Sequence, residues 1–330
     1  MGGGMPGTDR LWVPLLSHYG RSGGGVAIDA DRMAAHLSFI RPSVRQFLIA
    51  GSTGDGWELD QDTLLALLDL TRRDGLFSGT RILFGALRAD TPGVVETARA
   101  VERSLREKGP TAAEFRGFAV CPPIDPGAGQ DAILAHYQAV IAATESPIAV
   151  YQLPQVTGCS IAPETMRVLA ANPRVTMFKD TSGTDTVATA GVEGVTLVRG
   201  AEGRYAEMLK PAGPYDGWLL STGNSLGPQL RRMLDLLEAG RAADAARLSG
   251  VMTAVVDALF DAARDLPFGN PFSNANRAVD HLWAHGRAWR DAAPPLTASG
   301  NTLPEPFLEA VADIVGRFPS LPDRGYLAGA

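Results

Sequence analysis

A lysine at the end of an apolar run is the residue of this sequence whose position most favours chemistry. Lys179 closes the run Val175–Phe178, which has the composition of a buried strand. Side chains alternate along a strand, so Lys179 would share one face with Met177 and Val175. If it points inward over these neighbours, it would be partly desolvated, and its amine could act as a nucleophile that forms a Schiff base. The alternative is a lysine that extends outward to solvent.

Two further segments carry polar side chains directly after apolar runs. Residues 51–56 read Gly-Ser-Thr-Gly-Asp-Gly, and the hydroxyls of Ser52 and Thr53 could bind an anion together with the backbone N–H groups of this turn. The segment lacks the lysine of a phosphate-binding loop, which disfavours a triphosphate. Tyr151 ends another run and could transfer protons. The alternatives are an ordinary turn and a core tyrosine.

Eight short apolar runs could bring these residues to one end of a single fold. The runs are bounded by Gly, Pro or Asp and separated by amphipathic helical patterns, which is typical of parallel strands buried on both sides. They are Leu11–Leu16, Phe47–Ala50, Arg81–Ala86, Gly117–Cys121, Ile148–Leu153, Val175–Lys179, Thr196–Arg199 and Gly217–Ser221. This alternation predicts an α/β fold, a (β/α)8 TIM barrel, whose catalytic groups gather at the carboxyl ends of the strands. An open doubly wound sheet is the alternative, but residues 15–25 lack a dinucleotide fingerprint.

After about residue 226 the pattern becomes purely helical. The expected helices are Pro228–Glu238, which closes the barrel, and then Ala242–Arg264, Asn274–Ala288 and Glu305–Phe318. The predicted organisation is a flexible N-terminal tail at residues 1–9, a catalytic barrel at 10–240 and a C-terminal α-helical extension at 241–330. The weak helical pattern at Thr184–Gly194 predicts a short or irregular helix.

The composition is that of a globular, mildly acidic chain. Its 330 residues are 45% hydrophobic and carry 30 Lys and Arg against 36 Asp and Glu, a net charge of −6. These values disfavour a disordered chain and a nucleic-acid binder. No apolar stretch approaches the roughly 18 residues of a membrane span. The two cysteines, Cys121 and Cys159, fit a reducing compartment and are expected to be small buried thiols. We therefore expect a soluble, cytoplasmic protein that binds neither nucleic acid nor membrane.

Taken in order, the three segments resemble a known family, the pyruvate-dependent class I aldolases that include dihydrodipicolinate synthase and N-acetylneuraminate lyase. The family motifs Gly-Thr-Thr-Gly-Glu, Tyr-Asn-x-Pro-x-x-Thr-Gly and Lys-Asp-Ser-Ser-Gly correspond to residues 51–55, 151–158 and 179–183. Residues 217–227 resemble the family's eighth strand and the loop after it, with Asn224 in place. The resemblance runs from about residue 10 to the C-terminus.

This resemblance implies a lyase that forms a Schiff base between Lys179 and the C2 carbonyl of pyruvate or a related 2-oxo acid. By the matching positions, Tyr151 would move protons, and Ser52 and Thr53 would hold the carboxylate of the 2-oxo acid. A C–C bond would be made or broken without a metal ion or an organic cofactor. The family's common assembly, a homotetramer built as a dimer of dimers, implies a homo-oligomer, dimer or tetramer.

Two departures from the family pattern disfavour dihydrodipicolinate synthesis. The synthases follow their fourth strand with Pro-Tyr-Tyr, whose second Tyr crosses a subunit interface, whereas residues 121–124 here are Cys-Pro-Pro-Ile. They also carry an arginine for the carboxylate of the aldehyde substrate, where this chain has the apolar Val156. We therefore predict a substrate that resembles a sugar acid, with its hydroxyls bound by Glu202 and Ser221. Glu202 could instead cap a short helix that follows it.

Alternative functions stay open from the sequence alone. A decarboxylating or simple dehydratase of a 2-keto-3-deoxy sugar acid would use the same Schiff base and differ in its leaving group. A non-catalytic barrel could act as a ligand sensor or scaffold, although keeping both Lys179 and Tyr151 argues against it. His281 and His285 have a metal-binding spacing without the glutamate of a zinc protease, so we predict no metal site. Trp57 and Trp218 could line the pocket or pack in the barrel wall, and we expect packing.

Overall fold

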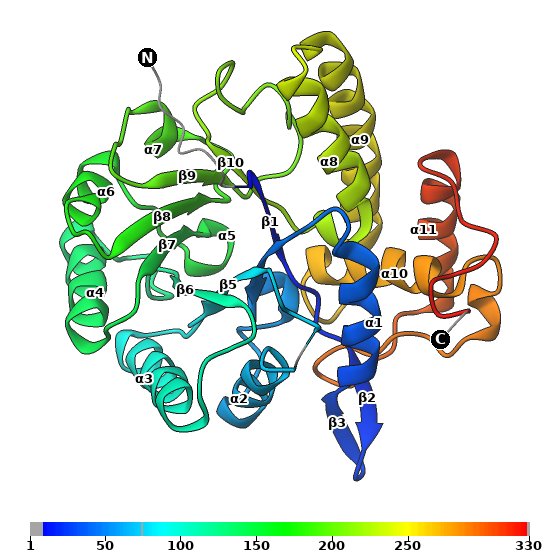
Figure 1. Cartoon of the computed structure of the whole chain (residues 1–330), viewed down its shortest axis with the longest axis horizontal. Coiled ribbons are helices and arrows are strands. Elements are labelled where there is room, and N and C mark those ends of the chain that lie inside the picture. The colour runs from blue at the N-terminus through cyan, green and yellow to red at the C-terminus, as the bar shows by residue number, and fades with distance from the viewer. Residues whose placement is uncertain (1–8, 74, 329–330) are drawn as a thin grey trace.

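The computed structural model describes residues 9–73 and 75–328, and its centre is a closed barrel of eight parallel strands surrounded by helices (Figure 1). The barrel strands are β1 (Leu11–Pro14), β4 (Gln46–Ile49), β5 (Arg81–Gly85), β6 (Glu114–Val120), β7 (Ile148–Gln152), β8 (Val175–Asp180), β9 (Thr196–Arg199) and β10 (Gly217–Leu219). Strands that follow one another in the chain are paired, and β1 closes the ring between β10 and β4. The predicted TIM barrel and its eight strands are therefore confirmed.

The connecting helices and turns differ widely in length. They are α1 (Ala30–Ile40), η1 (Ser52–Gly54), α2 (Gln61–Leu70), α3 (Thr91–Lys108), α4 (Gln130–Ala143), α5 (Pro154–Thr157), α6 (Pro163–Ala170), α7 (Thr186–Thr189) and α8 (Gly223–Glu238). Asp60 begins α2 by accepting a hydrogen bond from the Thr63 backbone N–H at 2.8 Å, as expected of an N-cap. The weak pattern at Thr184–Gly194 corresponds to the four-residue α7, so the short helix predicted there is confirmed.

One apolar side chain from each strand contributes to a single buried cluster inside the barrel. Its members are Trp12, Leu48, Leu83, Ala119, Ala149, Met177, Val198 and Leu219, all buried. Small and large side chains share this cluster, which fills the interior as the packed layers do in other barrels of this type. Lys179 follows Met177 by two positions on β8, so it points to the same interior, closer to the carboxyl ends of the strands.

The C-terminal helices α9 (Ala242–Ala263), α10 (Pro271–His285) and α11 (Glu305–Arg317) stack beside α8 and α1 on one side of the barrel (Figure 1). They share an apolar core of their own, and a short 3-10 helix, η2 (Trp289–Asp291), lies between α10 and α11. The predicted boundary near residue 240 falls between α8 and α9, and we keep this division as a proposal.

Two local features differ from the expected pattern. Helix α10 begins at Pro271, three residues earlier than predicted, because the Asn270 side chain accepts a hydrogen bond from the Ser273 N–H at 2.7 Å. Strands β2 (Tyr19–Ser22) and β3 (Gly25–Ile28) form a small antiparallel hairpin after β1.

The predicted tail lies outside the described residues except for Asp9, which pairs with Arg231 at 2.6 Å. No helix in the described part of the chain is long and apolar enough to cross a membrane.

Candidate active site

Lys179 and Tyr151 lie side by side at the carboxyl ends of β8 and β7. The register of the two strands pairs them directly, and their side chains are 4% and 2% exposed. The Lys179 Nζ atom lies 3.8 Å from the centroid of the Tyr151 ring. The ring face stabilises the resting ammonium, which must lose a proton before it reacts, and the apolar cluster below excludes water from the rest of the lysine chain. The arrangement suits an amine that reacts with a carbonyl group entering from the mouth of the barrel.

Gly200, the residue directly after β9, leaves room for this lysine. A Cβ atom at position 200 would lie only 2.8 Å from Lys179 Cε, which is closer than two carbon atoms can approach. A side chain there would push the lysine away from its place over Tyr151. The one sequence signal for this role is a glycine at the end of an apolar run.

The hydroxyl-bearing turn after β4 lies beside Tyr151. Ser52 Oγ accepts a hydrogen bond from Trp57 Nε1 at 2.9 Å and lies 3.4 Å from the Tyr151 hydroxyl, which donates to it. Thr53 is buried in the same turn. The structure thus brings Ser52 to the Lys179–Tyr151 pair, with Thr53 next to it in η1. The sequence did not reveal the hydrogen bond from Trp57, which is more than a packing residue.

Helix α10 holds this turn from behind. The backbone oxygens of Ser52 and Thr53 accept hydrogen bonds from Ser273 Oγ at 3.2 and 3.0 Å, and Asn270 Nδ2 donates to the Ser52 oxygen at 2.9 Å. Asp55 closes the turn in a left-handed conformation, with φ of 57°.

An ion pair between Asp55 and Arg277 of α10 secures that conformation. Arg277 Nη2 lies 2.6 Å from Asp55 Oδ2, and the two side chains are 1% and 3% exposed. The Tyr19 hydroxyl donates to the same carboxylate oxygen at 2.9 Å. Because the pair is buried, neither charge can be removed without leaving the other unpaired.

Glu202 and Ser221 are brought together between the loops that follow β9 and β10. Glu202 accepts hydrogen bonds from Ser221 Oγ at 2.9 Å, from the N–H and hydroxyl of Thr222 at 3.1 and 2.7 Å, and from the Tyr205 hydroxyl at 3.1 Å. Burial raises the pKa of Glu202, and these donors oppose the shift. The residues directly after Glu202 form turns rather than a helix, so the carboxylate contacts the residues that lead into α8 and not a helix of its own loop.

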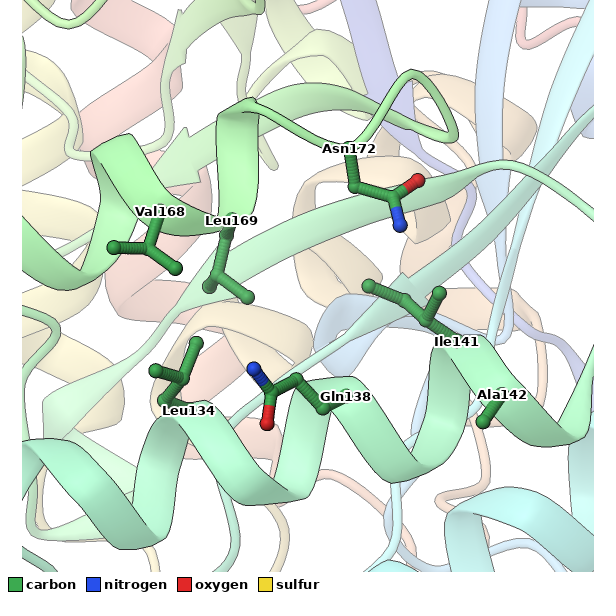
Figure 2. Close-up of a pocket in the computed structure, with 7 residues that line it drawn as sticks. All are labelled: Leu134, Gln138, Ile141, Ala142, Val168, Leu169 and Asn172. Carbon is green, nitrogen blue, oxygen red and sulfur yellow. The ribbon is translucent and has the colours of Figure 1, made fainter.

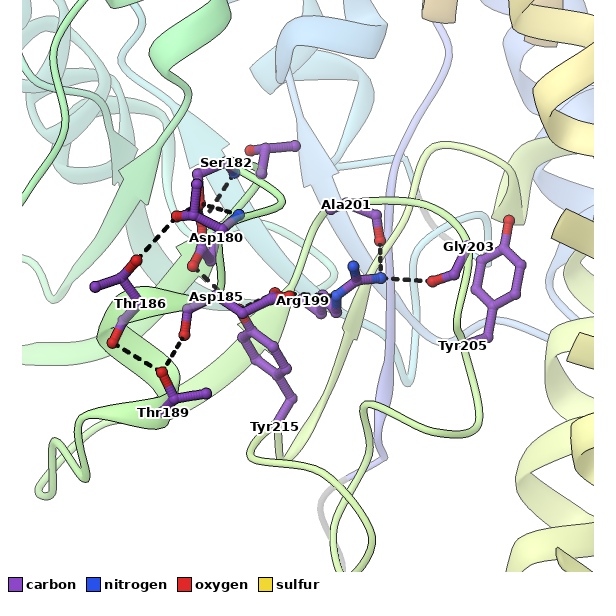
Figure 3. Close-up of polar contacts among 12 residues, drawn as sticks. Asp180, Ser182, Asp185, Thr186, Thr189, Arg199, Ala201, Gly203, Tyr205 and Tyr215 are labelled. Atoms are coloured by element: carbon purple, nitrogen blue, oxygen red, sulfur yellow. Dashed lines mark hydrogen bonds and ion pairs between the residues drawn. The ribbon is translucent and has the colours of Figure 1, made fainter.

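Behind the site, a polar network ties together the ends of β7, β8 and β9 (Figure 3). Asp180 accepts hydrogen bonds from Gln152 Nε2 at 3.1 Å and from the Tyr215 hydroxyl at 3.0 Å. The same hydroxyl lies 2.8 Å from Asp185, which pairs with Arg199 at 3.2 Å. Burial and the two carboxylates raise the pKa of Tyr215. Gln152 and Asp180 directly follow Tyr151 and Lys179, so the network fixes the strand ends that carry both residues.

A second buried polar cluster joins the barrel to the C-terminal helices. Asp280 of α10 lies 2.8 Å from His18 Nε2 and 2.7 Å from His36 Nδ1, and it also contacts Arg32 and the Tyr326 hydroxyl. One potential ligand atom from each of His18, His36 and Asp280 lies within 4.8 Å of the others. Arg32 already occupies the carboxylate, and its positive charge would repel a cation, so these residues do not fit a metal ion.

The remaining candidate residues have structural roles. His281 Nε2 lies 3.0 Å from the Trp289 backbone oxygen, so this member of the His281–His285 pair already has a hydrogen-bond partner within the protein. Both cysteines are buried, and burial raises the pKa of the Cys121 thiol. Trp218 is fully buried and packs in the barrel wall as predicted, with its ring N–H on the Tyr205 oxygen at 3.2 Å.

A groove of about 270 Å³ lies on the outer surface between α4 and α6, away from the candidate site (Figure 2). Its lining consists of Leu134, Gln138, Ile141, Ala142, Val168, Leu169 and Asn172. Candidate site residues are not among those that line it, so this groove is separate from the candidate site.

A (β/α)8 barrel with an inward lysine beside a tyrosine is the arrangement expected of Schiff-base lyases, the class I aldolases. Residues 30–269 match the model of the Dihydrodipicolinate synthetase family. The chain therefore belongs to this family of pyruvate-binding aldolases and lyases, whose members use a lysine Schiff base without a cofactor.

Individual relatives agree with this assignment. The 4-hydroxy-tetrahydrodipicolinate synthase of Parasynechococcus marenigrum (strain WH8102) is 31% identical over 266 residues, which cover 78% of this chain and 82% of that protein. Among solved structures, YagE from E. coli K12 in complex with pyruvate has a TM-score of 0.75 at 18% identity, covering 94% of this chain and 98% of that one. CdNal from Clostridium difficile in complex with mannosamine has a TM-score of 0.74 at 14% identity, covering 94% and 100%. The structural likeness confirms the fold.

Proposed function

We propose that this chain is a Schiff-base lyase in which Lys179 attacks the C2 carbonyl of pyruvate or a related 2-oxo acid. The neutral amine adds to the carbonyl, and the carbinolamine loses water to give a protonated imine. Tyr151, whose ring lies 3.8 Å from Lys179 Nζ, exchanges the protons that these steps require. The single observation that carries the proposal is this buried lysine–tyrosine pair at the carboxyl end of the barrel.

The imine then draws electrons from the neighbouring carbons. In the cleavage direction, the C4 hydroxyl of a 2-oxo-4-hydroxy acid gives its proton to Tyr151, the C3–C4 bond breaks, and its electron pair moves to the enamine. An aldehyde leaves, and hydrolysis of the protonated enamine returns pyruvate and free Lys179. In our proposal, Ser52 and Thr53 hold the carboxylate throughout, which keeps the carbonyl carbon next to the amine.

The proposed substrate is a sugar-acid-like 2-oxo acid rather than the aldehyde used in dihydrodipicolinate synthesis. Val156, at the position of the family's carboxylate-binding arginine, is 40% exposed and cannot pair with an anion. The Glu202–Ser221–Thr222 cluster offers a carboxylate and two hydroxyls between neighbouring strand ends, which suits a polyol chain. We propose that substrate hydroxyls exchange for some of these internal hydrogen bonds.

The test is to trap the imine with borohydride and locate it by mass spectrometry. The sequence contains three lysines, and the other two, Lys108 and Lys210, lie on the surface in ion pairs. Incubation with pyruvate should label Lys179 alone. Lys210→Ala should still be labelled and Lys179→Ala should not. Labelling that survives Lys179→Ala, or no labelling with pyruvate and with larger 2-oxo acids, would refute the assignment.

A substrate screen then tests the proposed substrate class. Aldehyde release from 2-keto-3-deoxy sugar acids should exceed any dihydrodipicolinate synthesis. Release of carbon dioxide instead would identify a decarboxylating dehydratase, and substantial synthase activity would contradict the proposed substrate class.

A further inference from the structure

The hydrogen bond that Trp57 donates to Ser52 has no role yet in the candidate site. It lies in the turn that follows η1, partly buried, and packs against a small apolar cluster formed by Leu87, Cys121, Tyr151 and Leu153. Packing alone does not require its ring N–H to point at a hydroxyl. That N–H nevertheless lies 2.9 Å from Ser52 Oγ, a well-formed hydrogen bond.

The direction of this hydrogen bond is unambiguous. An indole N–H can only donate, so Ser52 Oγ must be the acceptor. The Tyr151 hydroxyl, 3.4 Å away, also donates to Ser52 Oγ. A serine hydroxyl has two acceptor positions and one proton. Because its neighbours occupy the acceptor positions, the proton of Ser52 must point in the remaining direction.

The backbone of Ser52 is fixed from the opposite side. Its carbonyl oxygen accepts hydrogen bonds from Asn270 Nδ2 at 2.9 Å and from Ser273 Oγ at 3.2 Å. Helix α10 thus sets the place of the residue, and Trp57 and Tyr151 set the rotation of its hydroxyl. A hydroxyl held in this way is a donor that needs no reorientation when an anion binds.

We propose that Trp57 is a positioning residue: by donating to Ser52 Oγ, it commits the Ser52 hydroxyl to donate to the carboxylate of the bound 2-oxo acid. This inference rests on the proposed function. Trp57 does not touch the reacting atoms and acts only through Ser52. It also keeps Ser52 next to Tyr151, so that Ser52 links carboxylate binding to the proton-transferring hydroxyl of Tyr151.

The experiment is a double-mutant cycle on the rate of borohydride-trapped imine formation at a fixed, subsaturating pyruvate concentration. Trp57→Phe removes the N–H and keeps an aromatic ring. It should slow labelling of Lys179 about fivefold, the effect expected for one neutral hydrogen bond. In the Ser52→Ala background, where the acceptor is gone, Trp57→Phe should have no further effect. Trp57→Leu, which also lacks the N–H, enters the same cycle if Trp57→Phe does not fold.

Trp289→Phe is the matched control, because Trp289 is a buried tryptophan of the C-terminal core. It should leave the labelling rate unchanged in both backgrounds. An equal slowing by Trp57→Phe in the wild-type and Ser52→Ala backgrounds would overturn the proposal, since it would reveal a packing role. So would an unchanged rate in the Trp57→Phe variant. If the wild-type chain is not labelled at all, the proposed function fails first, and this inference fails with it.

Discussion

The ion pair between Asp55 and Arg277 offers the sharpest test of how the candidate site is built. Arg277→Met keeps much of the side-chain volume and removes the charge. Asp55, 3% exposed, would be left with the Tyr19 hydroxyl as its remaining side-chain donor. Removing one partner of a buried pair destabilises a protein by about 3–5 kcal/mol, because the other charge stays buried and uncompensated. We expect a loss of free energy of unfolding in that range.

The same change should loosen the turn that carries Ser52. The half-saturating pyruvate concentration in the trapping assay should therefore rise more than the maximal labelling rate falls, because Lys179 and Tyr151 stand on strands that this pair does not touch. Adding Asp55→Asn to Arg277→Met removes the orphaned charge and should restore a large part of the lost stability.

Urea unfolding of both variants measures their free energies of unfolding. The surface pair of Arg290 and Glu309, joined at 2.7 Å, provides the control. Arg290→Met should leave the unfolding midpoint unchanged, because water replaces the exposed partner. An Arg277→Met variant as stable as the wild type, or a double variant no more stable than the single one, would contradict this role of the ion pair.

Two other variants test separate parts of the structure. Gly200→Ala would place a Cβ 2.8 Å from Lys179 Cε and should slow imine trapping about tenfold or more while the fold persists, so a rate equal to wild type would contradict the geometry. Burial lowers the pKa of His18 to about 4, although the negative charge of Asp280 opposes this shift. The stability that neutral His18 contributes is therefore complete above pH 6.5 and is lost as the pH falls from 6.5 to about 4. Over that window the free energy of unfolding should fall by on the order of 2–3 kcal/mol more in the wild type than in His18→Asn, and parallel urea-unfolding profiles of the two proteins would exclude this role.

The barrel was predictable because its determinants are local. Each strand is a short apolar run, and the alternation of side chains was enough to predict that Lys179 and Met177 share a face. Helix starts were less predictable. The expected start of α8 at Pro228 lies inside the observed helix, which begins at Gly223 and has a kink at Leu226. Proline favours the first turn of a helix, and here it follows the kink.

The contacts that complete the candidate site were not predictable in this way. Arg277 is 222 residues from Asp55 in sequence, and Asn270 is 218 residues from Ser52, so no local pattern connects them. Trp57 is only five residues from Ser52, yet its ring could equally have packed in the core without a hydrogen bond. For Arg277 and Asn270 the information lies in how the turn and α10 meet, and for Trp57 it lies in how the turn itself packs, which the folded chain alone determines.

These contacts also decide what the C-terminal helices do. The division proposed near residue 240 separates a barrel from an extension, and Lys179 and Tyr151 both lie on barrel strands. The carboxylate-binding turn proposed here also lies in the barrel, but Asn270, Ser273 and Arg277 of the extension hold it on one side. A barrel without α10 would keep its lysine and lose the support of the turn that places a 2-oxo acid against it. In the proposed function the extension is therefore part of the candidate site's construction, and changes at its barrel-facing surface should alter substrate binding before they alter the chemistry proposed at Lys179.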